Sequence, residues 1–250
     1  MYERRVATCL GCLRQSNEQA PLSQIRASDD SRFYDLLMGS PLILLSGFAL
    51  SGFVILIPQQ WRAPHTDYPL ILSEVATALF LSVQLVLVCI RRLPINKITG
   101  FWPKAWAFVG SNAGYALLLF PRTALGPNLA VLSTLIIIAG TLASLITLIW
   151  LGRAFAIFPQ ARTFVTRGPY AYVRHPLYLS EQLAMLGVAL QYRQPWGLLV
   201  FVVSFGLQFP RMHYEEVVLA ATFAEYGAYT RSTPRLIPLS FRLRVVCKRS

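Results

Sequence analysis

Apolar residues run along this chain in six long blocks, with most of the charged residues gathered between them. A helix needs about 20 apolar residues to cross the hydrocarbon core of a bilayer, and the blocks are close to that length. The fifth block is the least apolar because Ser180, Glu181 and Gln182 interrupt it, so it fits a span, a segment buried in protein or a partly re-entrant segment. The predicted spans are 36–57, 70–90, 104–120, 128–151, 176–191 and 195–212.

The composition agrees with a membrane location. The chain of 250 residues is 55% hydrophobic and 14% charged, and its mean hydropathy is +0.50. This is more apolar surface than one soluble core could hide. The predicted fold class is therefore all-α, a polytopic helical membrane protein with about six transmembrane helices.

The net charge of +12 raises the question of nucleic-acid binding, and the distribution of the charge answers it. Of the 23 Lys and Arg residues, all but Arg62, Arg122 and Arg193 fall in the termini and in the loops on one side of the predicted spans. Cytoplasmic loops retain positive residues, so we expect both termini inside and no nucleic-acid partner. The inner basic excess also suits contact with anionic membrane lipids.

The ends of the chain carry little chemistry of their own. The first 35 residues are charged throughout and lack the apolar core of a cleavable signal peptide, so the first span is expected to direct insertion. Cys9 and Cys12 have the spacing of half a metal-binding knuckle, but no second pair completes four ligands, so no metal site is predicted. Cys247 is followed by Lys248 and Arg249, which do not fit a prenylation motif.

The unusual polar residues are concentrated in the second half of the chain. The run from Gly168 to Tyr178 contains tyrosines, Arg174, His175 and two prolines at the entrance to the fifth span. Proline fixes the backbone locally, and the amides of a helix N-terminus together with Arg174 suit an anionic group. The alternative is an interfacial aromatic belt with a positive anchor and a structural histidine.

Two further clusters fall on the same predicted side of the membrane. Glu215 and Glu216 end the sixth span, and since adjacent helical residues point about 100° apart, only one of them can face a given pocket while the other is within reach of Arg211. The glutamates could equally form a solvated helix end. The third cluster follows the membrane and consists of Tyr226, Tyr229, Arg231, Pro234 and Arg235.

In these residues the chain resembles the isoprenylcysteine carboxyl methyltransferases, an integral-membrane family related to the phospholipid N-methyltransferases. The resemblance covers about residues 150 to 240. It rests on Gly168-Pro169-Tyr170, Arg174-His175-Pro176-x-Tyr178, Gly187, Glu215-Glu216, Phe223, Tyr226-Gly227, Tyr229 and Arg235-Leu236-Ile237-Pro238. The run from Phe223 to Gly227 departs from the Phe-Gly of many family members.

The resemblance implies S-adenosylmethionine as cofactor and a lipidic or isoprenoid acceptor. The cofactor-binding residues that it implies are Tyr170, His175, Pro176, Tyr178, Glu215 and Glu216, and the residues that it implies for catalysis are Arg174, Glu216 and Arg235. The expected parts are a cytoplasmic segment (1–35), a four-helix scaffold (36–151), a methyltransferase-like region with two helices (152–240) and a basic tail (241–250). The active site is expected to face the cytoplasm.

The sequence leaves other functions open. A phospholipid N-methyltransferase fits the same residues, and then Glu216, Glu215 or His175 would receive the proton of the amine. A sterol-type membrane reductase with a nicotinamide cofactor shares a His-Pro-containing C-terminal region. A small transporter could line a pathway with Glu181, Glu215 and His175, although the paired broken helices of transporters are not evident. The acceptor and the oligomeric state are not readable from the sequence.

Overall fold

All six predicted apolar blocks are helical in the computed structural model, which describes residues 25–27, 32–62, 68–121, 123 and 125–237. In chain order the main helices are α2 (Arg32–Trp61), α3 (Tyr68–Ile90), α4 (Phe101–Asn112), α5 (Pro127–Leu151), α6 (Pro176–Leu190) and α7 (Trp196–Thr222). The short elements are β1 (Ile25–Ala27), β2 (Asn96–Ile98), β3 (Gln160–Ala161), α8 (Tyr226–Ser232) and the 3-10 helices η1 (Ala113–Leu119), η2 (Gly152–Ala154) and η3 (Gly168–Ala171).

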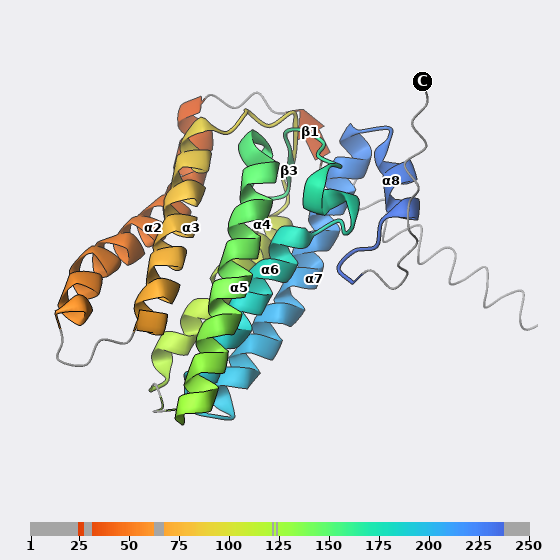
Figure 1. Ribbon diagram of the computed structural model, residues 1–250. Coiled ribbons are helices and arrows are strands. Elements are labelled where there is room, and N and C mark those ends of the chain that lie inside the picture. The colour runs from red at the N-terminus through yellow and green to blue at the C-terminus, as the bar shows by residue number, and fades with distance from the viewer. Residues whose placement is uncertain (1–24, 28–31, 63–67, 122, 124, 238–250) are drawn as a thin grey trace, which may run out of the picture.

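Successive helices run in alternating directions along the bundle. One end of the bundle therefore brings together the start of α2, the end of α3, the end of α5, the start of α6 and the end of α7. The strands and α8 lie at the same end (Figure 1). We call this the site end. Arg62 and Arg193 lie beyond α2 and α6 at the opposite end, as the charge pattern predicts, and Arg122 is outside the described residues.

Three helices in the described part of the chain are long and apolar enough to cross a membrane, with spans Ile43–Trp61, Ile71–Ile90 and Pro127–Ala154. This is the pattern of a multi-pass membrane protein. The predicted span 104–120 is divided between α4 and η1, and α6 has only 15 residues. Neither α6 nor α7 is among these three helices, so their crossing of a membrane stays a prediction.

The α5 helix has the inverse of a soluble amphipathic pattern. Leu135 and Ile149 are more than half exposed, whereas hydroxyl and small side chains face inward. Membrane helices associate through such small and polar residues, because aliphatic side chains are as well accommodated by lipid tails as by another helix. The buried positions are Ser133, Thr134, Ile137, Gly140, Thr141, Ser144, Thr147 and Leu148.

The α5 and α6 helices pack closely along each other, and glycine makes this possible. A Cβ atom at Gly140 would lie 2.3 Å from the backbone nitrogen of Ala184, and one at Gly187 would lie 2.8 Å from the backbone oxygen of Ser133. The Ser133 hydroxyl donates to the Gly187 carbonyl at 2.9 Å. This packing holds the middle and the last turn of α6 against α5.

A buried ion cluster ties three segments together at the site end. Asp35 accepts from Arg91 at 2.8 Å and from Arg162 at 2.5 Å, so one carboxylate links α2, the end of α3 and the loop after α5. All three side chains are at most 5% exposed. The loop from α5 to α6 is therefore anchored before it reaches the predicted site.

The prediction of an all-α fold omits a small antiparallel sheet with strand order β1-β2-β3. Ile25 pairs with Ile98, and Asn96 pairs with Ala161. Strands of two or three residues are too short to show an alternating pattern, so they could not be predicted from the hydrophobic pattern. The sheet joins the segment before α2 to the loops that follow α3 and α5.

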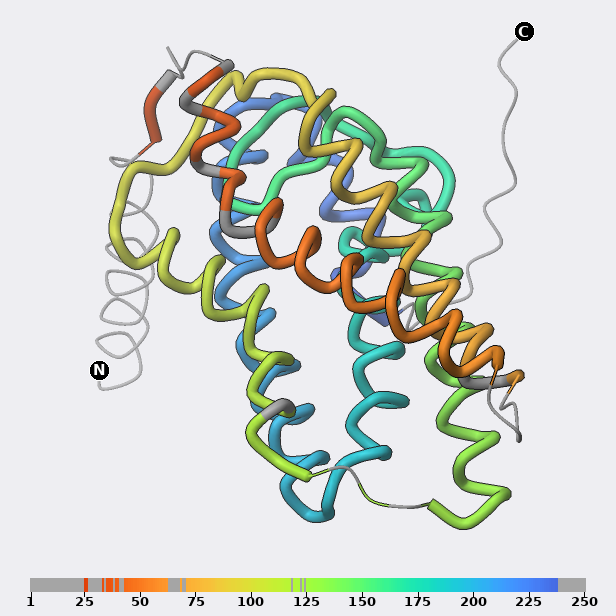
Figure 2. The backbone as a smooth tube through the Cα atoms, turned by 90° about the vertical axis from the view of Figure 1, so that its left-hand side faces the viewer, coloured from red at the N-terminus to blue at the C-terminus, as the bar shows by residue number. Residues whose placement is uncertain are grey.

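Two helical layers leave room for a site between them. The α4 helix packs along α7, whereas α2 packs on α3, and α3 on α5 (Figure 2). The α6 helix contacts both α5 and α7 and so joins the two layers. Side chains from both layers can therefore face one internal space.

Candidate functional site

A fixed backbone elbow precedes α6. Pro176 is the first residue of the helix, where its missing N–H costs nothing and its φ angle suits the first turn. The backbone N–H groups of Arg174 and His175 donate to the carbonyls of Pro234 and Arg235, at 2.9 and 3.1 Å. The segment after α8 thus holds the elbow in place and brings the last predicted cluster beside the first.

Three basic side chains contact the carboxylate of Glu216. Its Oε1 atom lies 2.9 Å from Nε2 of His175, 3.0 Å from Arg174 and 3.1 Å from Nε of Arg235, and its Oε2 atom accepts from Arg235 at 2.5 Å. Glu216 is 11% exposed at its side chain and His175 is 3% exposed. These contacts join α7, the elbow and the segment after α8 into one charged cluster, which we call the Glu216 cluster.

The Glu216 cluster determines the ionisation of its central carboxyl. Burial alone would raise the pKa of Glu216, but hydrogen bonds from His175 and Arg235 and their positive charge lower the pKa to about 2. The same hydrogen bond raises the pKa of Arg235. Glu216 is therefore an anion throughout the physiological range, and a role for it as a proton acceptor is disfavoured.

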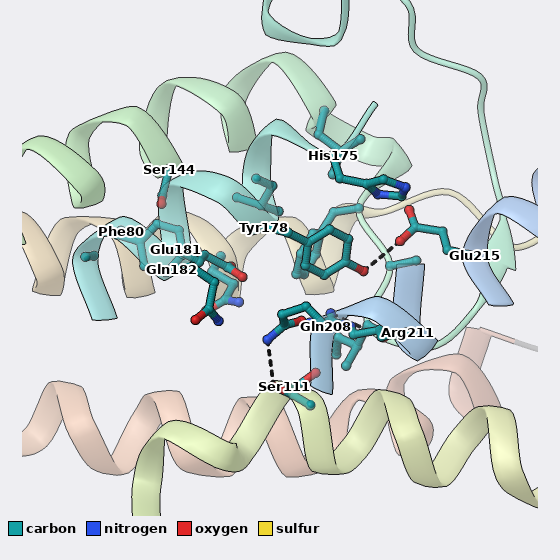
Figure 3. A pocket seen from close by; sticks show the side chains of 18 of the residues that line it. Phe80, Ser111, Ser144, His175, Tyr178, Glu181, Gln182, Gln208, Arg211 and Glu215 are labelled. Carbon is teal, nitrogen blue, oxygen red and sulfur yellow. Dashed lines mark hydrogen bonds between the residues drawn. The ribbon is translucent and has the colours of Figure 1, made fainter. Parts of the chain in front are cut away.

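The neighbouring Glu215 points in another direction, into the cavity of the bundle (Figure 3). The hydroxyl of Tyr178 donates to Glu215 at 2.6 Å. The predicted pairing of a glutamate with Arg211 is wrong, because that guanidinium lies 4.6 Å over the ring of Tyr178 and donates to Gln208 at 3.4 Å. The two adjacent acids therefore have separate roles, one in the charged cluster and one on the cavity wall.

An aromatic cluster forms the next part of the wall. The ring of Phe164 stacks on Phe223 at 5.5 Å and contacts Tyr226 and Tyr229 at 5.7 and 5.4 Å. The Tyr229 hydroxyl donates to the carbonyl of Tyr170 at 2.6 Å, which fixes η3 against α8. Burial, followed by the nearby glutamates, raises the pKa of Tyr226, so it remains a neutral phenol.

A cavity of about 540 Å³ extends from this end into the bundle. Ligand pockets in proteins commonly measure about 300 to 1,000 Å³. The predicted scaffold contributes to its walls, since Ser46, Thr77, Gln84, Ser111 and Tyr115 all line it. The cavity is therefore lined by residues of both the predicted four-helix scaffold and the predicted methyltransferase-like region.

Sequence reasoning missed several cavity residues. Phe164 lies in an irregular loop and Gln208 within an apolar span, so neither stood in a recognisable motif. Glu181 and Gln182 were interpreted as an interruption of the fifth span, and Glu181 also as part of a possible transport pathway, but neither was predicted for the methyltransferase site; both line the cavity. A polar pair within an otherwise apolar block was the available signal.

The residues predicted from the resemblance come together at the site end. Tyr170, Arg174, His175, Tyr178 and Glu215 line the cavity. Arg235 and Glu216 lie in the Glu216 cluster, and Pro176 starts the helix that carries Tyr178. In the described part of the chain, no three His, Cys, Asp or Glu side chains are grouped to hold a metal ion. Cys9, Cys12 and Cys247 lie outside the described residues.

Comparison with known families gives a match over residues 121–226, to the phospholipid methyltransferase family. The matched segment includes α5, α6 and α7 and ends at the first residue of α8. It therefore contains the elbow and both glutamates. Arg235 lies beyond it.

Two curated proteins are similar to part of the chain. The cobalt-zinc-cadmium resistance protein CzcN of Cupriavidus metallidurans is 36% identical over 77 residues, which cover 30% of this chain and 36% of that protein. The nickel-cobalt-cadmium resistance protein NccN of Alcaligenes xylosoxydans xylosoxydans is 29% identical over 80 residues, which cover 32% and 38%. The aligned parts thus span little more than a third of each relative.

Proposed function

We propose that this chain is an integral-membrane methyltransferase that uses S-adenosylmethionine and acts on a lipidic or isoprenoid acceptor. The observation that carries the proposal is the cavity, which has the Glu216 cluster and Glu215 at one end and continues between helices with lipid-facing apolar surfaces. The match of residues 121–226 to the phospholipid methyltransferase family supports it.

The cavity wall fits the charge and shape of the proposed cofactor. The carboxylate of Glu215 suits a cation such as an ammonium or sulfonium group. Arg174 lines the same space, and its buried Nε atom has no hydrogen-bond partner among the described residues, so it is a candidate for the cofactor carboxylate. The rings of Phe164, Tyr226 and Tyr229 offer surfaces on which a purine can stack.

When bound, S-adenosylmethionine would supply a methyl group on a positively charged sulfur. The chain itself would mainly position the reactants, an effect worth up to about 7 to 11 kcal/mol in favourable systems. Glu216 contributes by fixing Arg174 and His175, and Tyr178 contributes by orienting the Glu215 carboxylate.

The deeper cavity suits the apolar part of an acceptor. Phe53, Leu117, Ile137, Met185 and Val188 line it, and they come from both helical layers. An isoprenoid or acyl chain could occupy this part while its polar end faces the proposed cofactor site. Carboxyl O-methylation and amine N-methylation are both compatible with that arrangement.

The test is ligand binding followed by methyl transfer, with the full chain in lipid nanodiscs. Calorimetric titration with S-adenosylmethionine should give saturable binding, and Glu215→Gln should weaken it about tenfold or more through loss of a charged contact. Glu225→Gln removes the same charge from an exposed position on the protein surface and should bind as the wild type does. Radioactive methyl from the cofactor should then enter a lipid-extractable product.

The same titration separates the alternative functions. A membrane reductase predicts saturable binding of NADPH in place of S-adenosylmethionine. A transporter predicts neither methylated product nor a requirement for Glu215 in cofactor binding. Either result with correctly folded protein would refute the proposed methyl transfer.

A further inference from the structure

Two arginine residues meet on the outside of the bundle at the site end. The α3 and α5 helices pack on each other and both end here (Figure 1). The backbone N–H of Arg92, just after α3, donates to the carbonyl of Arg153, just after α5, at 3.0 Å. Both residues are exposed, and neither is among those that line the cavity. We call this pair the Arg92–Arg153 patch.

The surrounding structure fixes both arginines. The backbone carbonyl of Arg92 accepts from the buried side chain of Arg162. The Nη1 atom of Arg92 lies 3.5 Å from the Thr163 hydroxyl, and Nε of Arg153 donates to the carbonyl of Ile90 at 2.9 Å. Groups that are held in place before a ligand arrives lose less conformational entropy on binding than mobile surface side chains do.

The two guanidinium groups have no acidic partner among the described residues. Asp35, at the same end of the bundle, is already shared by Arg91 and Arg162. Within the described structure, the side chains of Arg92 and Arg153 form hydrogen bonds only through Nη1 of the first and Nε of the second. Their other N–H groups are available to a ligand, and paired guanidinium forks suit the oxygens of a phosphate group.

The patch lies at the depth expected for lipid headgroups. The apolar span of α3 ends at Ile90, and the apolar span of α5 ends at Ala154. Near these ends Trp150 is 51% exposed and Leu93 is 44% exposed. Exposed tryptophan is typical of the boundary between membrane and water. The two arginines therefore follow directly on apolar helix surface that faces lipid.

We infer that the Arg92–Arg153 patch binds the headgroup phosphate of an anionic membrane lipid, whose acyl chains lie along the outer surfaces of α3 and α5. The inference goes beyond the proposed methyl transfer, because this lipid is neither cofactor nor acceptor and lies outside the cavity. The patch selects a lipid with net negative charge, since the ammonium group of a zwitterionic lipid is repelled by the same two arginines.

Chemical modification of arginine tests the site without mutation. Phenylglyoxal labels exposed guanidinium groups, and peptide mass spectrometry gives the rate of labelling at each residue. The full chain is compared in nanodiscs of phosphatidylcholine alone and in nanodiscs that also contain phosphatidylglycerol with the same acyl chains. Arg26, exposed on β1 at the same end, is the internal reference, so any general effect of the charged membrane surface cancels.

Phosphatidylglycerol should slow the labelling of Arg92 and Arg153 about tenfold relative to Arg26, as expected for charge-assisted contacts. Inorganic phosphate added to phosphatidylcholine nanodiscs should not do so. Equal slowing at all three arginines would show only diffuse attraction to the membrane surface and would overturn the inference. Equal protection by inorganic phosphate would assign the patch to a soluble phosphate compound and would overturn it as well.

Two matched double substitutions give an independent test. Arg92→Gln with Arg153→Gln removes both charges of the patch, whereas Arg26→Gln with Lys104→Gln removes two charges from exposed positions on β1 and in the first turn of α4. Native mass spectrometry of chains released from mixed nanodiscs counts the two lipids that stay bound. The wild type and the control should retain phosphatidylglycerol about tenfold above its share of the membrane, and the patch variant should lose that preference.

The same loss in both variants, or retention by the patch variant, would contradict a specific site. If the patch variant does not fold, the labelling of the wild type still decides the question.

This inference and the proposed function fail separately. The patch variant leaves every cavity-lining side chain in place. A wild type that does not bind S-adenosylmethionine but shows selective protection of Arg92 and Arg153 would refute methyl transfer and leave the lipid site standing. A wild type that binds the cofactor without such protection would refute the lipid site alone.

Discussion

Replacement of Glu216 by glutamine tests the charged cluster that holds the elbow. The substitution keeps the size of the side chain but removes the anion shared by Arg174, His175 and Arg235. The folded protein lowers the pKa of this carboxyl from its ordinary value of 4.5 to about 2. Glu216→Gln should therefore destabilise the protein at neutral pH.

The magnitude follows from the change in pKa. One pKa unit corresponds to about 1.36 kcal/mol, so the full change would correspond to about 3 kcal/mol. Arg235 is 36% exposed, so solvent screens its ion pair with Glu216. The expected loss of stability in Glu216→Gln is therefore about 2 kcal/mol. For a chain of this size that is a fall in melting temperature of about 4 to 8 °C.

The pH dependence has a definite sign. A carboxyl with a lowered pKa stabilises the folded state above its unfolded pKa, and that contribution is lost as the pH falls toward the folded pKa. The difference in melting temperature between wild type and Glu216→Gln should be full at pH 7 and shrink between about pH 4.5 and 2. Differential scanning fluorimetry in nanodiscs measures it, with the exposed Glu225→Gln as the control.

Two results would refute this reasoning. One is a Glu216→Gln protein with the same melting temperature as the wild type at pH 7. The other is a difference that persists unchanged at the acid end of the range, which would show that the loss comes from packing and not from charge.

Three further substitutions test the fold and the cavity wall. Gly140→Ala should lower the melting temperature because its Cβ would overlap the backbone of Ala184, whereas Gly206→Ala, which has open space around it, should be nearly neutral in the same thermal assay. Asp35→Asn should cost about 3 to 5 kcal/mol because it leaves two buried guanidiniums without their anion, and an unchanged thermal midpoint would contradict the bridging role. Tyr178→Phe removes the hydroxyl that orients the cavity-facing glutamate, so calorimetry should show weaker binding of S-adenosylmethionine with little change in stability, and equal affinity would contradict that role.

The sequence was most informative where a physical constraint acts on a long segment. Bilayer thickness sets the length of an apolar block, so the main helices were predictable from length and hydropathy alone. Charge asymmetry likewise predicted which loops share one end, and Arg62 and Arg193 are where it places them. The prediction for 104–120 was less accurate, because apolar character does not distinguish a continuous α-helix from one that ends in a 3-10 segment.

The meeting of the elbow with the double glutamate was also predictable, because topology places both at one end. The individual partners were not. Adjacent residues on a helix diverge, but the sequence does not say which of Glu215 and Glu216 turns toward the elbow. Which glutamate faces the elbow depends on the position of Arg235, which follows α8 and contacts both Glu216 and the elbow. No local sequence pattern encodes such a contact between distant segments.

Polar residues within apolar segments were the least well interpreted part of the sequence. Glu181 was interpreted as an interruption of a span or as part of a transport pathway, and Asp35 fell in the charged segment of the first 35 residues. In the structure one lines the cavity and the other bridges Arg91 and Arg162. Both are expensive to bury, and such residues are better treated from the start as candidates for function or for a specific structural link.

The central claim is that Glu215 and the aromatic cluster around Phe164 enclose a methyl donor at the site end of the cavity. A crystal structure of the full chain with S-adenosylhomocysteine tests it most directly. The account predicts density for the amino-acid part beside Glu215 and Arg174, with the purine near Phe164. Density at another position with this cavity empty would contradict it.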